Sequence, residues 1–140
     1  TQLDELERLS PSRRLLVEAA QIEWMNPRPA HLEAATSAAA STGDLPRLST
    51  VDLEVLALSL GLKRPLVTDD YRLQNVAMKA GIAARSLATR GAKQQWSWVW
   101  RCTGCGKEHD VSTSAKRERD GPGPDCDVCG SPTVMKRPRR

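Results

Sequence analysis

The chain has 140 residues, of which 39% are apolar and 27% charged, and its formal net charge is +4 at pH 7. This length allows one domain with a modest core and a small appendage. It contains no run of about 18 apolar residues and no signal-peptide pattern, so we expect a cytoplasmic protein that does not cross a membrane.

The first 47 residues carry helical patterns and one candidate strand. The apolar spacing predicts helices over residues 3–8 and 11–20, and Ile22 to Trp24 predicts a strand. An alanine-rich run predicts a further helix over residues 30–41, which Thr42 and Gly43 would end. This mixture is typical of an α/β domain.

The next segment predicts a helix with an acidic first turn. Ser49 has the chemistry of an N-cap, and Asp52 follows three residues later at the start of an apolar run. We expect Gly61 to end this helix.

A short strand and a further helix follow. Leu66 to Thr68 reads as a strand that leads directly into Asp69 and Asp70, where a helix with one apolar face begins, and Gly81 would close that helix. Ligands of open α/β sheets bind outside the carboxyl ends of the strands. Asp69 and Asp70 therefore lie where a site is expected, and Asp52 can reach the same edge.

These three aspartates have two interpretations. An acidic residue in the first turn of a helix satisfies backbone amides and complements the helix dipole. Clustered carboxylates repel one another, however, and a hard divalent cation such as Mg²⁺ or Mn²⁺ makes such a cluster tolerable. Both interpretations stay open at this stage.

All four cysteines lie in the last third of the chain, as two CxxC pairs separated by 20 residues. This spacing is typical of a zinc ribbon, in which four thiolates hold a structural Zn²⁺ and leave no position for catalysis. A glycine follows each pair and permits a tight turn. Disulfide pairing is the alternative, which a cytosolic context disfavours. The predicted ligands are Cys102, Cys105, Cys126 and Cys129.

Tryptophans and basic residues surround the cysteines. Trp96, Trp98 and Trp100 alternate and predict a strand with three indoles on one face, which either packs the ribbon or stacks on unpaired bases. Residues 1–90 carry 11 basic and 11 acidic side chains, whereas residues 91–140 carry 10 basic and 6 acidic ones, which favours a polyanionic partner. The candidate RNA-contacting residues are Arg101, Lys107, Lys136, Arg137, Arg139 and Arg140.

Several motifs together resemble one family. They are TGD at 42–44, LSTVDLEVLAL at 48–58 and VTDDYRLQNVA at 67–77, followed by the tryptophan-rich segment and the cysteine pairs. The chain is similar to the archaeal-type Nob family (NIN-one-binding protein) of PIN-domain endoribonucleases. The resemblance implies a Rossmann-like PIN domain, with a parallel sheet and flanking helices, followed by a small zinc ribbon. It also implies removal of the 3′ extension of small-subunit precursor rRNA on the maturing small ribosomal subunit.

The resemblance implies a set of metal ligands as well. Asp52 matches the middle acid of the family, Asp70 matches the acid of its T-x-D strand end with Asp69 beside it, and Glu5 matches a helical glutamate. These residues would hold Mg²⁺ or Mn²⁺. PIN domains also open with a strand that ends in a ligand aspartate. We expect that strand upstream of Thr1, and the activity depends on it.

The sequence suggests a division into a PIN domain (1–90), a connecting tryptophan-rich strand (91–101), a zinc ribbon (102–135) and a basic tail (136–140). The favoured function is metal-dependent hydrolysis of RNA. The alternative is a catalytically incompetent RNA- or ribosome-binding module in which the ribbon docks and the PIN domain is a scaffold. A toxin-like PIN nuclease is disfavoured, because such proteins generally lack a ribbon.

Overall fold

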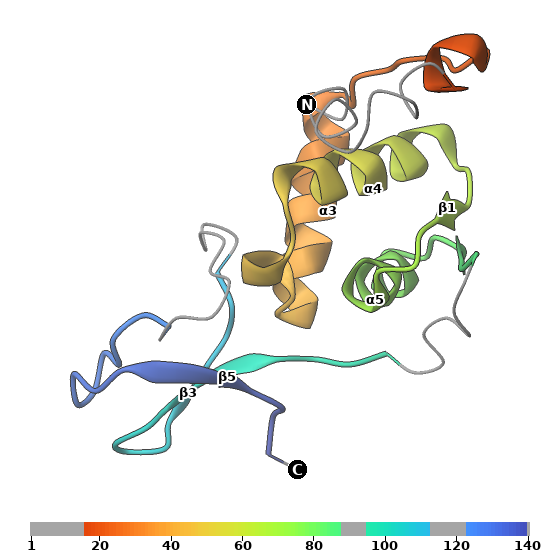
Figure 1. Ribbon diagram of the computed structural model, residues 1–140. Helices are drawn as coiled ribbons and strands as arrows, with labels where there is room; N and C mark the ends of the chain where they lie inside the picture. The colour runs from red at the N-terminus through yellow and green to blue at the C-terminus, as the bar shows by residue number, and fades with distance from the viewer. Residues whose placement is uncertain (1–15, 88–94, 113–122, 140) are drawn as a thin grey trace.

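A computed structural model describes residues 16–87, 95–112 and 123–139 (Figure 1). The α/β part, residues 16–87, lies above the strands of the cysteine module, residues 95–139. A short helical segment at 16–19 precedes the named elements. These are α3 (Pro29–Thr42), the 3₁₀ turn η1 (Leu45–Arg47), α4 (Thr50–Leu62), β1 (Leu66–Val67), α5 (Tyr71–Lys79), β2 (Ala84–Arg85), β3 (Val99–Cys102), β4 (Glu108–His109) and β5 (Thr133–Lys136).

Helix α3 confirms the predicted alanine-rich helix and forms one wall of the core. Its buried alanines face α4 and α5, whose Leu56 and Val76 are fully buried. Small side chains let helix axes approach closely, so apolar area is buried with few large residues. As predicted, the helix ends at Gly43, whose φ of 80° is left-handed and whose amide donates to the carbonyls of Ala39 and Ala40.

The predicted strand at Ile22–Trp24 is wrong. Residues 21–28 have no regular structure, and Ile22 and Trp24 are 47% and 45% exposed. A two-residue apolar alternation forms a strand only where a neighbouring strand accepts its hydrogen bonds. Among the described residues no strand pairs with this segment. The helix predicted over residues 3–8 lies outside the described residues, and of the one predicted over 11–20 they include only the helical turn at 16–19.

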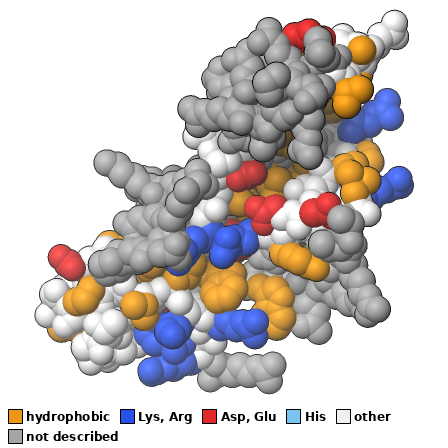
Figure 2. Space-filling model, in the orientation of Figure 1, with side chains coloured by type: hydrophobic (Ala, Val, Ile, Leu, Met, Phe, Trp, Pro, Cys, Tyr) orange, Lys and Arg blue, Asp and Glu red, His pale blue; other side chains and the backbone are white. Residues whose placement is uncertain are grey.

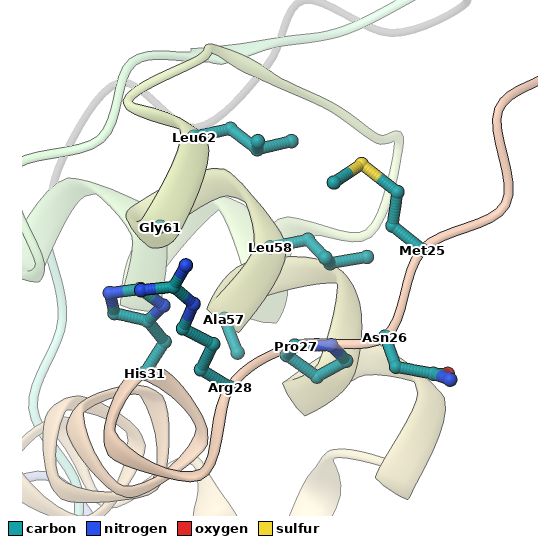
Figure 3. A pocket seen from close by; sticks show the side chains of 9 residues that line it. All are labelled: Met25, Asn26, Pro27, Arg28, His31, Ala57, Leu58, Gly61 and Leu62. Carbon is teal, nitrogen blue, oxygen red and sulfur yellow. The ribbon is translucent and has the colours of Figure 1, made fainter.

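Helix α4 begins as predicted but ends later. It continues through Gly61 to Leu62, and Lys63 ends it in the left-handed conformation with φ 52°. Gly61 instead serves the packing of α4 on α3, because a Cβ there would lie 2.5 Å from Nδ1 of His31. Figure 3 shows His31 beside Gly61 at a pocket that residues 25–28 and α4 line.

The short strands β1 and β2 form a parallel pair, with Leu66 opposite Ala84 and Val67 opposite Arg85. Helix α5 lies between them in the chain, as the crossover of a parallel pair requires. The sequence predicted β1 and α5 but not β2, whose residues are exposed and lack an apolar pattern. The parallel strands and flanking helices confirm the predicted α/β class.

The cysteine module is an antiparallel sheet of three strands in the order β4-β3-β5. Trp100, on the central strand, is 5% exposed and packs so closely under Gly123 that a Cβ there would lie 2.4 Å from the ring. The predicted strand with three indoles on one face is wrong, since β3 begins only at Val99. Trp98 lies outside the strand: its amide donates to the carbonyl of Thr42 in the α/β part at 2.7 Å and not to a neighbouring strand.

In the described part of the chain no helix is long and apolar enough to span a membrane. The cytoplasmic location stays a prediction. The four-part division of the chain also stays a prediction, and β3 runs across its suggested boundary between residues 101 and 102.

The packing of Gly61 can be tested with a double-mutant cycle. Alanine is favoured over glycine inside a helix by about 1 kcal/mol. We expect Gly61→Ala to lose that gain in the parent chain, where the new methyl meets the His31 ring, and to recover it in a His31→Ala background. Urea unfolding of the four proteins measures this coupling. Equal effects of Gly61→Ala in both backgrounds would contradict the packing role.

Candidate active site and metal centre

Asp52 is fixed by a capping box at the start of α4. Its Oδ2 accepts hydrogen bonds from the backbone amide and the hydroxyl of Ser49, both at 2.7 Å, and its own amide donates to the Ser49 hydroxyl at 3.1 Å. The carboxylate is therefore held in one orientation at the positive end of the helix dipole. The predicted cap is confirmed.

Asp69 and Asp70 are adjacent in the chain but contact different elements. Oδ1 of Asp70 accepts from the amide of Arg72 at 2.8 Å and caps α5. Oδ1 of Asp69 accepts from the amide of Leu87 at 3.0 Å and from the Ser86 hydroxyl. Asp70 is thus fixed on the helix, whereas Asp69 joins the end of β1 to the segment that follows β2.

The predicted acidic cluster is not assembled as a compact ligand set in the part of the chain that the structure describes. There, the only groups of three or more ligand atoms within 4.8 Å of one another involve cysteines. Glu5 lies outside the described residues. The assignment of Asp52, Asp69, Asp70 and Glu5 as metal ligands stays a prediction. Figure 2 shows acidic side chains near the middle of one face, directly above Lys and Arg side chains.

Asp44 is a buried acid that the sequence reasoning missed. Its side chain is 1% exposed, and Oδ2 accepts from Nδ2 of Asn75 at 2.6 Å. Burial raises the pKa of this carboxyl above its ordinary value, against hydrogen bonds from Asn75 and Thr42 and the charge of Arg72. An aspartate just after a helix end is usually exposed, so the sequence gives no signal for its burial.

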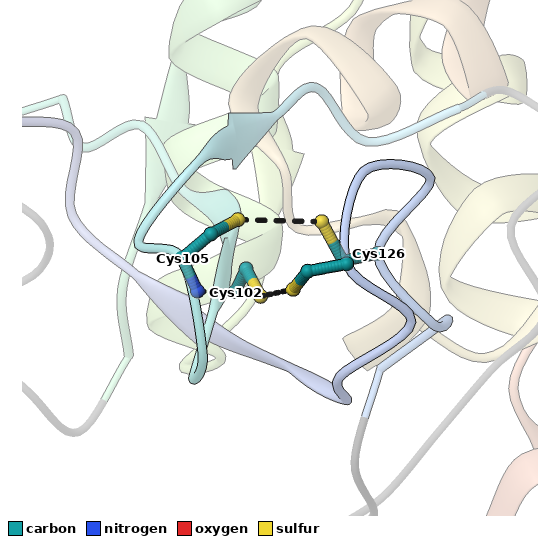
Figure 4. Close-up of side chains that lie close together, drawn as sticks. Cys102, Cys105 and Cys126 are labelled. Carbon is teal, nitrogen blue, oxygen red and sulfur yellow. Dashed lines mark hydrogen bonds between the residues drawn. The ribbon is translucent and has the colours of Figure 1, made fainter.

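The four cysteine sulfurs converge, as predicted. Sγ of Cys102 lies 3.3 Å from that of Cys129, and Sγ of Cys105 lies 3.7 Å from that of Cys126 (Figure 4). All four sulfurs lie within 4.8 Å of one another, and no pair is bonded as a disulfide. Tetrahedral coordination with metal–sulfur bonds of about 2.3 Å separates sulfurs by roughly 3.8 Å. The cluster therefore has the size of a four-thiolate metal site.

Backbone amides of the two turns point at these sulfurs. The amides of Gly104 and Cys105 lie 3.3 and 3.4 Å from Sγ of Cys102, and that of Val128 lies 3.5 Å from Sγ of Cys126. Gly106 and Gly130 follow with φ of 74° and 71°, which confirms the predicted tight turns. Such donors favour the thiolate that a metal requires.

The thiols do not share one electrostatic environment. The backbone amide and the hydroxyl of Ser131 lower the pKa of Cys129 to about 6. The amide of Lys107 lowers the pKa of Cys105, but desolvation and the neighbouring sulfurs outweigh it and raise this pKa to about 11. Negative charge on one sulfur thus opposes charge on the next, and a bound cation removes that conflict.

His109 also contacts the cluster, although its sequence spacing gave no sign of it. Its Nε2 lies 3.4 Å from Sγ of Cys126, and its Nδ1 lies 3.6 Å from Oδ1 of Asp127. Lys107 in turn lies 3.2 Å from the same Asp127 oxygen. This row of polar groups gives one sulfur an outer hydrogen-bonding partner.

The side chains of three candidate RNA-contacting residues have partners within the chain, and the amide of Arg139 donates to Oε1 of Glu108 at 3.1 Å. Arg101 donates from Nε and Nη2 to Oε1 of Glu108 at 3.0 and 2.7 Å, which lowers the pKa of Glu108. Lys107 pairs with Asp127, and the Arg137 guanidinium lies 3.6 Å from the centre of the Trp96 ring. Lys136 and Arg139 are exposed, and Arg140 lies outside the described residues. RNA contact by these six residues stays a prediction.

The burial of Asp44 predicts a pH-dependent effect on stability. Since its folded-state pKa is raised above 3.8, the charged form costs folding free energy at neutral pH, and that cost vanishes as the pH falls below 3.8. Asp44→Asn retains an oxygen acceptor for Asn75 without the charge. We expect it to be more stable than the parent at pH 7 by urea unfolding, with the difference shrinking on acidification. Glu33→Gln, an exposed change on α3, is the control, and a pH-independent difference would contradict this account.

Comparison with known proteins places these features in a family. A model of the PIN domain of ribonuclease matches residues 3–62. Endoribonuclease Nob1 of Pyrococcus abyssi is 39% identical over 125 residues, which cover 89% of this chain and 71% of that protein. Endoribonuclease Nob1 of Methanothermobacter thermautotrophicus is 34% identical over 123 residues, which cover 85% and 67%.

A nuclease with another name also matches. Ribonuclease VapC1 of Thermoplasma acidophilum is 37% identical over 109 residues, but these cover only 51% of that protein. The two Nob1 alignments extend over more of this chain and over at least two thirds of the relatives. They confirm the resemblance seen in the motifs: the chain belongs to the Nob1 family of PIN-domain endoribonucleases.

Proposed function

We propose that this protein is a metal-dependent endoribonuclease that removes the 3′ extension of small-subunit precursor rRNA during assembly of the small ribosomal subunit in the cytoplasm. The observation that carries the proposal is that 89% of the chain aligns with one protein named Endoribonuclease Nob1. The alignment covers 125 of the 140 residues, which is more than either part contains. It therefore includes residues of both the α/β part and the cysteine module.

The chain's own groups suit hydrolysis of a phosphodiester. Asp52 and Asp70 offer carboxylate oxygens, the donors that a hard divalent cation prefers, and Glu5 and Asp69 would complete the set. Hydrogen bonds from Ser49 and from the amide of Arg72 fix the two carboxylates at helix starts. When bound, Mg²⁺ or Mn²⁺ would lower the pKa of a water molecule and neutralise charge on the leaving oxygen.

The cysteine module would hold Zn²⁺ through Cys102, Cys105, Cys126 and Cys129. Thiolates are soft ligands, and the sulfur separations of 3.3 and 3.7 Å fit a tetrahedral site for this ion. Four protein ligands leave no open coordination position. The module would therefore be structural, with the chemistry confined to the carboxylates.

The partner in this proposal is the precursor rRNA on the maturing small subunit. The last strand of the module ends at Lys136, and Arg137 and Arg139 follow it. Figure 2 shows basic side chains next to the acidic side chains in the middle of one face. Such an arrangement would attract RNA phosphates to the module and place one phosphodiester bond of the RNA at the carboxylates. Trp96 is 39% exposed, with the Arg137 guanidinium over its ring, and would offer an aromatic surface to an unpaired base.

The metal assignment predicts the outcome of cysteine substitution. Native mass spectrometry should find one Zn²⁺ per chain and none in a Cys102→Ser, Cys126→Ser double variant, because two ligands of a closed four-thiolate site are lost. Thr103→Ser, in the same turn, is the control and should retain the ion. A disulfide between Cys102 and Cys126, or a metal-free parent chain, would refute the zinc site.

The assignment of Asp52 and Asp70 can be separated from their capping roles. Asparagine caps a helix almost as well as aspartate but lacks the charge that holds a divalent cation. In a chain that carries the strand expected upstream of Thr1, Asp52→Asn and Asp70→Asn should therefore melt close to the unsubstituted chain and bind RNA, yet lose Mn²⁺-dependent cleavage of RNA that spans the small-subunit 3′ end by about 100-fold or more.

Glu54→Gln removes a carboxylate from the body of α4 and serves as the matched control, which should cleave normally. Retained cleavage in both asparagine variants would leave these residues with capping roles only. If the chain with the upstream strand binds this RNA without cleaving it, even with Mn²⁺ in excess, the result would support the alternative of a non-catalytic RNA-binding module.

A further inference from the structure

The side chain of Asn75 binds the backbone that leads into the cysteine module. Its Oδ1 accepts from the amide of Trp96 at 2.6 Å, and its Nδ2 donates to the carbonyl of Trp96 at 2.8 Å. Asn75 lies on α5 and is 3% exposed. A side-chain amide thus pairs with this backbone residue in the way that a neighbouring strand would.

Asp44 completes this arrangement from a second element. Its Oδ2 accepts from Nδ2 of Asn75 at 2.6 Å, and the acid is 1% exposed. The amide group therefore donates to two acceptors and accepts from one donor. Asparagine alone combines two donors and an acceptor at this reach, since aspartate would face Asp44 with like charge and leucine would offer no hydrogen bond. Burial makes each unmade bond costly, so one orientation is strongly preferred.

Further contacts fix the same segment on both sides. The amide of Trp98 donates to the carbonyl of Thr42 at 2.7 Å, and a Cβ on Gly43 would lie 2.1 Å from the carbonyl oxygen of Trp98. From the module side, the Arg137 guanidinium lies 3.6 Å from the Trp96 ring centre and 5.8 Å from that of Trp98. The segment Trp96–Trp98 is thus bound to the α/β part and to the continuation of β5.

Helix α5 carries this contact and a candidate metal ligand together. Asp70 caps the helix and Asn75 follows five residues later, a rise of about 7.5 Å along one rigid element. We propose that the Asn75–Asp44 pair is a positioning latch that fixes the cysteine module relative to Asp70 and thereby sets which phosphodiester bond of a bound RNA is cleaved. This inference rests on the proposed ribonuclease function.

The latch is tested first without any activity measurement. In Asn75→Ala the amide of Trp96 loses its acceptor, so its hydrogen exchange, followed by NMR on the full chain, should accelerate by between about tenfold and a hundredfold. Val76→Ala is the matched control, because it truncates the next, fully buried residue of α5 without removing a hydrogen bond to the segment. Asp44→Asn preserves the acceptor and should exchange like the parent.

The cleavage position is tested second, in chains that carry the strand expected upstream of Thr1, by mapping the product ends of an RNA that spans the small-subunit 3′ end, with Mn²⁺. The parent, Val76→Ala and Asp44→Asn should cut at one dominant bond. Asn75→Ala should distribute its cuts over several neighbouring bonds while total hydrolysis changes less than threefold. A loss of stability alone would lower the yield at one position and would not spread it.

The outcomes separate this inference from the function beneath it. Unchanged exchange at Trp96 in Asn75→Ala would overturn the latch, and so would accelerated exchange with one unaltered cleavage site. If the unsubstituted chain with the upstream strand does not cleave, the proposed function fails and the positional claim with it, whereas the exchange data still decide whether Asn75 holds the module.

Discussion

The hydrogen bond between Asn75 and Asp44 is the contact on which the arrangement of this protein depends. It joins α5 to the turn that follows α3, and through Trp96 it joins both to the cysteine module. Asp44 is charged at neutral pH only at a cost, since burial raises its pKa. A buried acid without a partner is strongly destabilising, whereas the same acid with a defined donor specifies one geometry. The hydrogen bonds to Asp44 compensate only part of its desolvation cost, and what they add is a fixed arrangement of the two parts of the chain.

Capping and chemistry make compatible demands on the acidic residues. A carboxylate at a helix start accepts backbone hydrogen bonds that hold its orientation, and a fixed orientation suits a metal ligand. Asp52 and Asp70 are held in this way by Ser49 and by the amide of Arg72. Asp69 differs, because its hydrogen bonds to Ser86 and Leu87 connect the chain beyond β1 and β2. Asp69 and Asp70 are therefore neighbours in the chain with different structural roles.

The cysteine module has few buried apolar residues in the part that the structure describes. Its sheet is small, and the buried residues that the structure describes there are Trp100, Cys102, Val111, Cys126 and Thr133, so a bound metal would supplement a small core. The pKa values of its thiols are far apart, because the amide and hydroxyl of Ser131 lower that of Cys129 to about 6, whereas desolvation and the neighbouring sulfurs outweigh the Lys107 amide and raise that of Cys105 to about 11. The Arg137 guanidinium lies over the Trp96 ring, and the Trp98 amide donates to Thr42. These contacts attach the module to the α/β part.

The sequence by itself determined the features that depend on local chemistry. Ser49 and Asp52 define a helix start, Gly43 a helix end, and two CxxC pairs a four-sulfur cluster, because caps, left-handed turns and metal knuckles are set by residues close in the chain. Only the tertiary structure decided that Gly61 lies inside a helix, that Ile22 finds no strand partner, and that Asp44 is buried against Asn75, 31 positions away. These outcomes depend on which distant groups come into contact. The His31 ring leaves no room for a side chain at position 61, and a strand forms only where another strand pairs with it. A carboxyl group is buried only where the fold places hydrogen-bond donors beside it.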